Sequence, residues 1–322
     1  MQRDGTQSST TVDLDLDPQP NGGQKGGRRR GTTHKSQQTR LAILFLIPAL
    51  AVYLAFMVYP FFSTVYLSLT NWNGVAEAKD FVGFSNYAKM FGDGDVLKAF
   101  ANNVIWVVLG TVVPVAIGLV LSILIWSGVR GSLFFRTIFF LPFVLPLVVV
   151  GLVWQWIYHP LYGVVNKALD GVGLDGVSRA WLGEPGTALY AVLIAAIWAT
   201  FGFVVMILLA ALQNVDMSTV EAATIDGANW FQRTWHIILP QIAPVLTMVT
   251  SITLVGGFSV FDIIFVMTSG GPGTSSEVLA TYTYRAAFSQ NLAGYGSALA
   301  MLITLLSFVA AVSFVFLRER QR

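Results

Sequence analysis

The chain has 322 residues, of which 55% are hydrophobic and only 11% are charged. In soluble domains roughly a quarter of the residues are charged, so this composition argues against a soluble domain and for a membrane protein. The chain contains no cysteine, which excludes disulfide bonds and thiolate metal sites. The net charge of +2 is small, and the distribution of the charges along the chain is more informative.

The first 40 residues are rich in Gly, Ser, Thr, Gln and Arg. They lack the apolar surface that a folded core requires, so we predict a disordered tail over 1–40. They also lack the apolar segment of a cleavable signal peptide. The cluster 28–30 of three arginines could contact nucleic acid. We favour the alternative that it marks the cytoplasmic side of a membrane helix and contacts anionic lipid, and we expect no nucleic-acid partner.

Six long segments of the chain contain no Asp, Glu, Lys or Arg. Each exceeds the ~20 residues that cross a hydrocarbon core of ~30 Å, so we predict an all-α membrane protein with six transmembrane helices in one domain, 41–317, and a short tail, 318–322. Pro142 and Pro146 predict a kink in the third helix. The uncharged segments are 41–76, 99–129, 137–166, 185–215, 234–261 and 286–317. The helices are expected at about 41–69, 102–126, 137–158, 188–212, 241–268 and 291–317.

Lysine and arginine are unevenly distributed between the two sides of this predicted bundle. If the N-terminus is cytoplasmic, the cytoplasmic segments hold 13 of these residues and the external segments hold six. Positive residues concentrate on the cytoplasmic side of membrane proteins. We therefore predict that both termini, and the connection between the fourth and fifth helices, lie in the cytoplasm.

That connection is a polar segment with two helix-capping patterns. Ser218 and Glu221 have capping-box spacing, and Asn229 and Gln232 repeat it. Gly227, between the two patterns, predicts a left-handed turn that ends the first of two short helices. On pattern alone, such a segment could instead be an interfacial helix that rests on lipid headgroups.

The second short helix has an apolar face and a defined end. Phe231, Trp235 and Ile238 recur at i, i+4 and i+7, which places them on one side of a helix. Pro240 is typical of a first helical position, so we expect a new and longer helix to begin there.

The segment also resembles the Glu-Ala-Ala loop of the membrane subunits of binding-protein-dependent ABC importers. The family pattern is Glu-Ala-Ala, three residues, Gly, nine residues, Ile, one residue, Leu-Pro. It is matched without a gap by Glu221, Ala222, Ala223, Gly227, Ile237, Leu239 and Pro240. The resemblance implies the type I ABC importer permease fold, in a prokaryotic cytoplasmic (inner) membrane, with a cytoplasmic coupling-helix loop at 216–240.

The resemblance implies a mechanical role for this loop. It would dock in a cleft of a separate ATPase subunit and move as a rigid lever. Ala222 and Ala223 are small and permit close approach of two backbones, while Glu221 can cap its helix or reach a basic group on the ATPase. Asp226 belongs to the same coupling surface, and Gly227 sets the angle between the two helices. Ile237, Leu239 and Pro240 would transmit the movement into the fifth helix.

The residue inventory argues against an enzyme. The chain has three histidines, His34, His159 and His236, which the predicted topology keeps apart, so we expect no metal site. The motifs of metalloproteases, intramembrane serine proteases and phosphate-binding loops do not occur. We therefore expect no catalytic residue and no cofactor on this chain; the resemblance places ATP and magnesium on the partner ATPase.

A sugar pathway needs hydroxyl groups beside an aromatic face partway across the membrane. Thr250, Thr253, Gly257 and Phe261 recur at i, i+3, i+7 and i+11 of the expected fifth helix and form one stripe. The same stripe could be a small-residue packing seam, which we favour slightly. Asp262 follows it, about 33 Å along the helix from Pro240, so we favour an external or structural role for this carboxylate over an intramembrane ion site.

Further residues are similar to the carbohydrate branch of these permeases, the type related to the larger maltose-permease subunit. They are the run 261–268, Gly270, Gly271, Pro272, Tyr284, Phe288, Gly294, Tyr295 and Ala298. The resemblance implies a sugar importer with a second permease, two ATPase subunits and an extracytoplasmic solute-binding protein. The alternatives are the same architecture for another solute, such as glycerol phosphate or a polyamine, and a stand-alone ion-coupled transporter.

Overall fold

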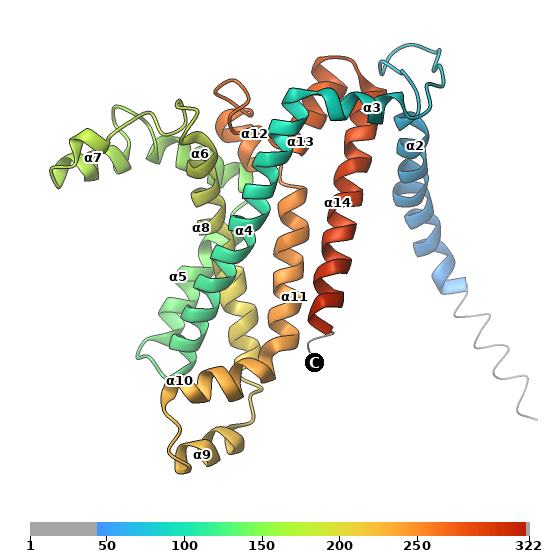
Figure 1. The fold of residues 1–322 in the computed structure, drawn as a ribbon. Helices are drawn as coiled ribbons and strands as arrows, with labels where there is room; N and C mark the ends of the chain where they lie inside the picture. Colours follow the sequence, from blue (N-terminus) through green and yellow to red (C-terminus); the bar gives the residue numbers. More distant parts are fainter. Residues whose placement is uncertain (1–43, 320–322) are drawn as a thin grey trace, which may run out of the picture. The chain divides into compact units, whose positions relative to one another are not determined.

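The computed structural model describes residues 44–319 (Figure 1), so the tail expected over 1–40 lies outside the described residues. In the described part, β structure is limited to one isolated bridge between Thr70 and Phe81. The helices are η1 Leu54–Val58, α2 Tyr59–Ser68, α3 Ser85–Gly92, α4 Gly94–Trp126, α5 Ser132–Val144, α6 Leu147–Ile157, α7 Val164–Gly171, η2 Asp175–Val177, α8 Ala188–Leu212, α9 Met217–Ile225, α10 Trp230–Arg233, η3 Thr234–Ile238, α11 Leu239–Phe258, α12 Asp262–Thr268, α13 Leu279–Tyr284, η4 Arg285–Ser289 and α14 Ala293–Glu319.

Five described helical segments are long and apolar enough to cross a membrane, and the pair α5 and α6 makes a sixth span if it is counted as one. The prediction of six membrane spans is confirmed when α5 and α6 are counted together as one span. The five continuous spans are Leu44–Ser68, Gly94–Trp126, Ala188–Leu212, Trp230–Phe258 and Ala293–Arg318.

The kink expected in the third helix is a break. The axes of α5 and α6 differ by 101°. Pro146 has no N–H to continue the helix and stands at the N-cap of α6, while Pro142 lies inside α5. The helix also begins earlier than expected, at Ser132, because the charged Arg136 is accommodated in its second turn.

The predicted bounds of the fifth helix, 241–268, were wrong at both ends. It is continuous with the preceding short helix, because a π-helical turn, η3, joins α10 to α11 just before Pro240. It ends at Phe258, where the Ser259 N–H donates to the Gly256 carbonyl at 3.2 Å. Asp262 is exposed at the first position of the separate helix α12, where a carboxylate is favoured by the helix dipole.

Close helix crossings hold residues 59–319 together. Helix α4 packs against α8 and α11, α5 against α8, α6 against α12, and α14 against α2 and α11. At the crossing of α5 and α8, a Cβ on Gly202 would lie 1.7 Å from the Phe139 carbonyl oxygen, so only glycine fits. A Cβ on Gly257 would lie 3.3 Å from the Val107 Cα at the crossing of α4 and α11.

Polar contacts fasten the end of the bundle where α3 and α13 lie, opposite α9 and α10 (Figure 1). Asp93 caps α4 and also accepts hydrogen bonds from the hydroxyls of Tyr282 at 2.7 Å and Tyr295 at 2.8 Å. Burial alone would raise the pKa of Asp93, but these hydrogen bonds hold it below its usual range. Asn102 donates to the carbonyls of Ser275 and Glu277, at 3.0 and 2.8 Å. The start of α4 is therefore tied to the segment 275–295.

Candidate functional site

The first half of the 216–240 loop is the short helix α9. Its N-cap is Asp216, whose Oδ1 accepts from the Ser218 N–H at 3.0 Å and from the Ser218 hydroxyl at 2.7 Å. The expected capping by Ser218 was therefore wrong, because the carboxylate is the stronger acceptor and engages the serine itself. The Asp216 N–H donates to Gln241 Oε1 at 2.9 Å, which ties the start of the loop to α11.

The second half has the predicted cap. Asn229 Oδ1 accepts from the Gln232 N–H, and Gln232 Oε1 accepts from the Asn229 N–H, both at 2.9 Å. Gly227 has φ +85°, the left-handed conformation expected of it. The Arg233 guanidinium donates to the Thr224 hydroxyl and links α10 to α9. The loop is therefore braced internally and at its joint with α11.

The motif residues of α9 face outward. Glu221, Ala222, Asp226 and Gly227 are exposed, and Ala223 is half-buried. Ile225, a large apolar side chain on this helix, is 87% exposed. Within the described residues, this outer surface has no covering element, so it is available to another subunit.

One buried side chain anchors α9, and the same cluster continues into the membrane helices. Val220 packs with Ile238 and Ile242, and Ile237 and Leu239 pack against the edge of this cluster. The expected apolar face of the second short helix is therefore divided. Ile238 is buried, whereas Phe231 and Trp235 are exposed and stack on each other with ring centres 6.1 Å apart.

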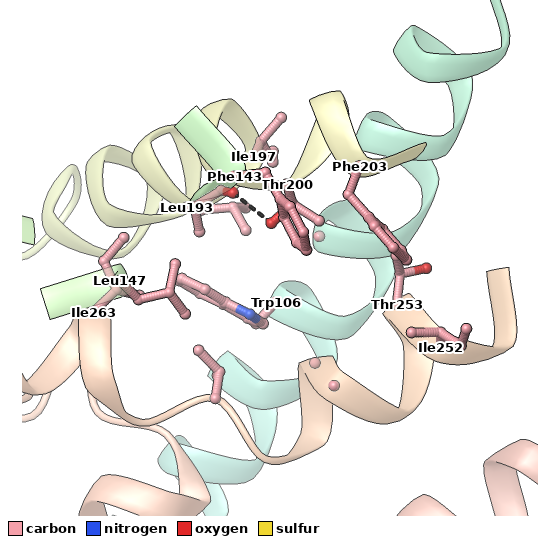
Figure 2. Close-up of a pocket in the computed structure, with 15 residues that line it drawn as sticks. Trp106, Phe143, Leu147, Leu193, Ile197, Thr200, Phe203, Ile252, Thr253 and Ile263 are labelled. Carbon is pink, nitrogen blue, oxygen red and sulfur yellow. Dashed lines mark hydrogen bonds between the residues drawn. The ribbon is translucent and has the colours of Figure 1, made fainter. Parts of the chain in front are cut away.

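A second candidate site is a cavity of about 290 Å³ inside the bundle (Figure 2). Helices α4, α5, α6, α8 and α11 contribute to it. The lining residues are Trp106, Gly110, Phe143, Leu147, Leu193, Ala196, Ile197, Thr200, Phe203, Ile252, Thr253, Gly256, Gly257, Val260 and Ile263. None of these side chains is charged, so the cavity offers no counter-charge to an ionic solute.

The cavity combines aromatic rings with a few polar groups. Figure 2 shows the Trp106 ring lying across its centre, with Thr200, Thr253 and Phe203 on neighbouring helices. The Thr200 hydroxyl donates to the Ala196 carbonyl at 2.8 Å, and the Thr253 hydroxyl donates to the Thr250 carbonyl at 3.0 Å. Both oxygens keep lone pairs that can accept from a solute hydroxyl.

The four residues of the stripe predicted on the fifth helix do not line one common site. Thr253 and Gly257 line the cavity, but Thr250 lines a different hollow beside α14. Phe261 lies beyond the end of α11, where it stacks on Phe265 with ring centres 5.0 Å apart and contacts the tilted ring of Tyr284 at 5.4 Å.

Sequence reasoning did not identify most of the cavity residues. Trp106, Phe143, Thr200 and Phe203 come from three different helices, and each lies within an apolar run that gives no sign of which side faces inward. The sequence feature that points to such residues is an indole or hydroxyl in the middle of a membrane span, because these groups need a polar partner that lipid cannot provide.

A buried carboxylate near the end of the bundle opposite α9 was also not predicted. The Glu277 side chain is only 2% exposed, and its Oε2 lies 2.9 Å from Nη2 of Arg285. The same guanidinium nitrogen lies 3.3 Å from Asp95 Oδ2. Burial raises the pKa of Glu277 to about 7, although Arg285 and Lys98 oppose the shift and Asp95 adds to it.

The raised pKa of Glu277 predicts a pH-dependent stability. An acid whose pKa is raised on folding binds its proton more readily in the folded state, so its contribution is complete below the unfolded value of 4.5 and is lost as pH rises through about 7. We expect the unfolding temperature to fall between pH 5 and pH 8, and Glu277→Gln to reduce this fall. Thermal unfolding in detergent measures it. Glu184→Gln, at a half-exposed carboxylate, is the control; an unchanged pH dependence in Glu277→Gln would contradict the prediction.

Comparison with known proteins identifies the family. A family model described as the binding-protein-dependent transport system inner membrane component matches residues 114–322. The chain belongs to this family. The permease is thus a multi-pass inner-membrane protein of a transport system, and the resemblance inferred from the Glu-Ala-Ala loop is confirmed.

Two curated relatives cover most of the permease. It is 37% identical over 274 residues to a probable ABC transporter permease protein, YurN, of Bacillus subtilis, an alignment that covers 84% of this chain and 94% of the relative. It is 32% identical over 310 residues to the diacetylchitobiose uptake system permease protein NgcF of Streptomyces coelicolor, covering 92% and 87%.

A solved structure supports the fold. A chain of a bacterial ABC transporter involved in the import of the acidic polysaccharide alginate matches with a TM-score of 0.78 and 22% identity. The match covers 89% of the permease and 98% of that chain. The importer-permease fold predicted from the sequence is therefore confirmed.

Proposed function

We propose that this permease forms the membrane pathway of an ATP-driven sugar importer. The observation that carries the proposal is the uncharged cavity in the bundle, where aromatic rings lie beside hydroxyl groups. Aromatic faces and a few placed polar groups suit a neutral polyhydroxylated ring. The name of the relative NgcF, which is given as a diacetylchitobiose uptake permease, points to the same substrate class. A phosphorylated solute or a polyamine would require a counter-charge in the pathway.

The 216–240 loop would couple this pathway to a separate ATPase subunit that binds ATP and magnesium. Three features support the assignment: the exposed outer surface of α9, the internal bracing of the loop, and the unbroken helix from Trp230 to Phe258. A rigid loop at the end of a continuous helix transmits displacement into the membrane without bending. Glu221, Ala222, Ala223, Asp226 and Gly227 form the docking surface, and Ile237, Leu239 and Pro240 form the joint.

The complete importer would contain a second permease, two ATPase subunits and an extracytoplasmic solute-binding protein. Both termini and the 216–240 loop lie in the cytoplasm in this proposal, in agreement with the excess of Lys and Arg on that side. Asp262 then lies toward the external side, at the exposed start of α12. This position does not suit an ion site of a stand-alone transporter.

Co-purification tests the proposal. An affinity-tagged permease should retain ATPase subunits, and variants of the α9 surface should lose them while remaining in the membrane. Labelling of intact cells provides the control for topology, because a cysteine introduced at Asn229 should not react with an impermeant reagent. Reaction from outside, or uptake by the permease without any partner, would contradict the proposal.

The cavity predicts a specific effect of Thr253→Val. The substitution keeps the shape of the side chain and removes one hydrogen-bond acceptor, so we expect the KM for uptake to rise by about fivefold. Radiolabelled sugar uptake measures it. Thr304→Val is the matched control, because the Thr304 hydroxyl also donates to a carbonyl of its own helix, Ala300, but lies outside the cavity. Equal effects of the two variants would argue against the cavity as the pathway.

A further inference from the structure

An apolar groove runs along the half of the bundle nearest the 216–240 loop, beside the cationic side chain of Arg318. It consists of two adjoining hollows of about 500 and 330 Å³, which share Leu119, Leu246 and Arg318. Helices α4, α11 and α14 form its walls, and Trp235 lies at the end nearest the loop. The groove is separate from the cavity at Trp106, with which it shares no lining residue.

The groove has the polarity and length of a lipid chain. Two of its three threonine hydroxyls are occupied, because Thr247 donates to the Ala243 carbonyl and Thr250 to the Leu246 carbonyl, both at 2.7 Å. The buried hydroxyl of Thr111 has no hydrogen-bond partner among the described residues. From Pro240 to Thr250 the groove follows ten residues of helix, about 15 Å at 1.5 Å per residue. This length equals one leaflet of a hydrocarbon core of ~30 Å.

Arg318 supplies a charge where the two hollows adjoin. Its Nε donates to the Thr247 hydroxyl at 3.3 Å, so the side chain reaches toward the groove wall. Among the side chains that the structure describes, no carboxylate lies within 4.0 Å of its guanidinium. Its remaining N–H groups can therefore donate to an anion, and the planar guanidinium suits a phosphate. Trp235 nearby is 59% exposed, as is usual for an indole at the headgroup layer.

We propose that this groove binds an anionic phospholipid, with an acyl chain between α4, α11 and α14 and the phosphate on Arg318. In the orientation proposed above, the lipid belongs to the cytoplasmic leaflet; the site itself requires only that Arg318 lies at a headgroup layer. Because α11 is continuous with the 216–240 loop, the bound lipid touches the helix that carries the loop.

Native mass spectrometry tests this site. The full-length permease, purified with its co-purifying subunits, is exchanged into an equimolar mixture of phosphatidylglycerol and phosphatidylcholine with the same acyl chains. We expect the wild type to retain phosphatidylglycerol over phosphatidylcholine by about fivefold. Arg318→Gln should bring this ratio close to one. Ala116→Trp, which adds bulk to the groove from an exposed position, should reduce retention of both lipids.

Arg130→Gln is the matched control, because it removes the same charge from an exposed turn at the same end of the bundle. It should leave the ratio unchanged. The proposal is wrong if Arg318→Gln keeps the preference, or if both arginine variants lose it equally, which would indicate attraction by overall surface charge. It is also wrong if no lipid survives exchange in the wild type, because another part of the transporter then fills the groove. None of these readouts depends on sugar transport.

Discussion

Uptake is expected to stop in Gly227→Pro and to fall by more than about tenfold in Glu221→Lys, with both proteins still in the membrane. Gly227 has φ +85°, whereas the proline ring holds φ near −65°. Proline also lacks the N–H that donates to the Thr224 carbonyl at 3.2 Å. Glu221 is exposed, so a lysine there leaves the fold intact and reverses the charge presented to the ATPase.

Solute uptake by cells, together with the amount of permease in their membranes, measures both effects. Gly227→Asn is the control for the turn, because asparagine tolerates the left-handed region and should retain uptake. Asp175→Lys is the control for charge, since it reverses an exposed carboxylate in a different loop. Normal transport by both test variants would refute the coupling role, and loss of either protein from the membrane would indicate a folding role instead.

Gly202→Ala is expected to destabilise the permease by roughly 3 kcal/mol or more. The added Cβ would lie 1.7 Å from the Phe139 carbonyl oxygen and 2.6 Å from its carbon. Both atoms belong to the backbone of α5, which cannot move aside as a flexible side chain can. The helices α5 and α8 must therefore separate, and they lose the contact between Phe139 and Phe201, whose ring centres lie 5.7 Å apart.

Thermal unfolding of the purified variant, and its abundance in membranes, measures this loss. Gly256→Ala is the control, because nothing lies within 4 Å of a Cβ at that position. Alanine in place of a helical glycine should add about 0.5–1 kcal/mol of stability there. If Gly202→Ala unfolds at the same temperature as the wild type, the α5–α8 crossing opens at little cost in free energy.

Local features of the loop illustrate how far sequence reasoning reaches. The left-handed turn at Gly227 and the cap formed by Asn229 and Gln232 depend on neighbouring residues only, and both were predicted. The spacing of Ser218 and Glu221 predicts Ser218 as the cap of α9, but the Asp216 carboxylate two residues earlier takes that position. The start of the fifth helix differs from its prediction for another reason: Pro240 is compatible with a helix that has already begun, because a π-helical turn precedes it.

The sequence by itself determined the number of membrane spans and the family, because lipid requires long uncharged helices and the Glu-Ala-Ala pattern is contiguous along the chain. Only the tertiary structure decided which residues meet in the cavity and in the groove. In a membrane helix, the face toward lipid and the face toward the core are both apolar, so periodicity does not show how the helix is rotated. That rotation is set by contacts between helices distant in sequence, such as Gly202 on Phe139 and Gly257 on Val107.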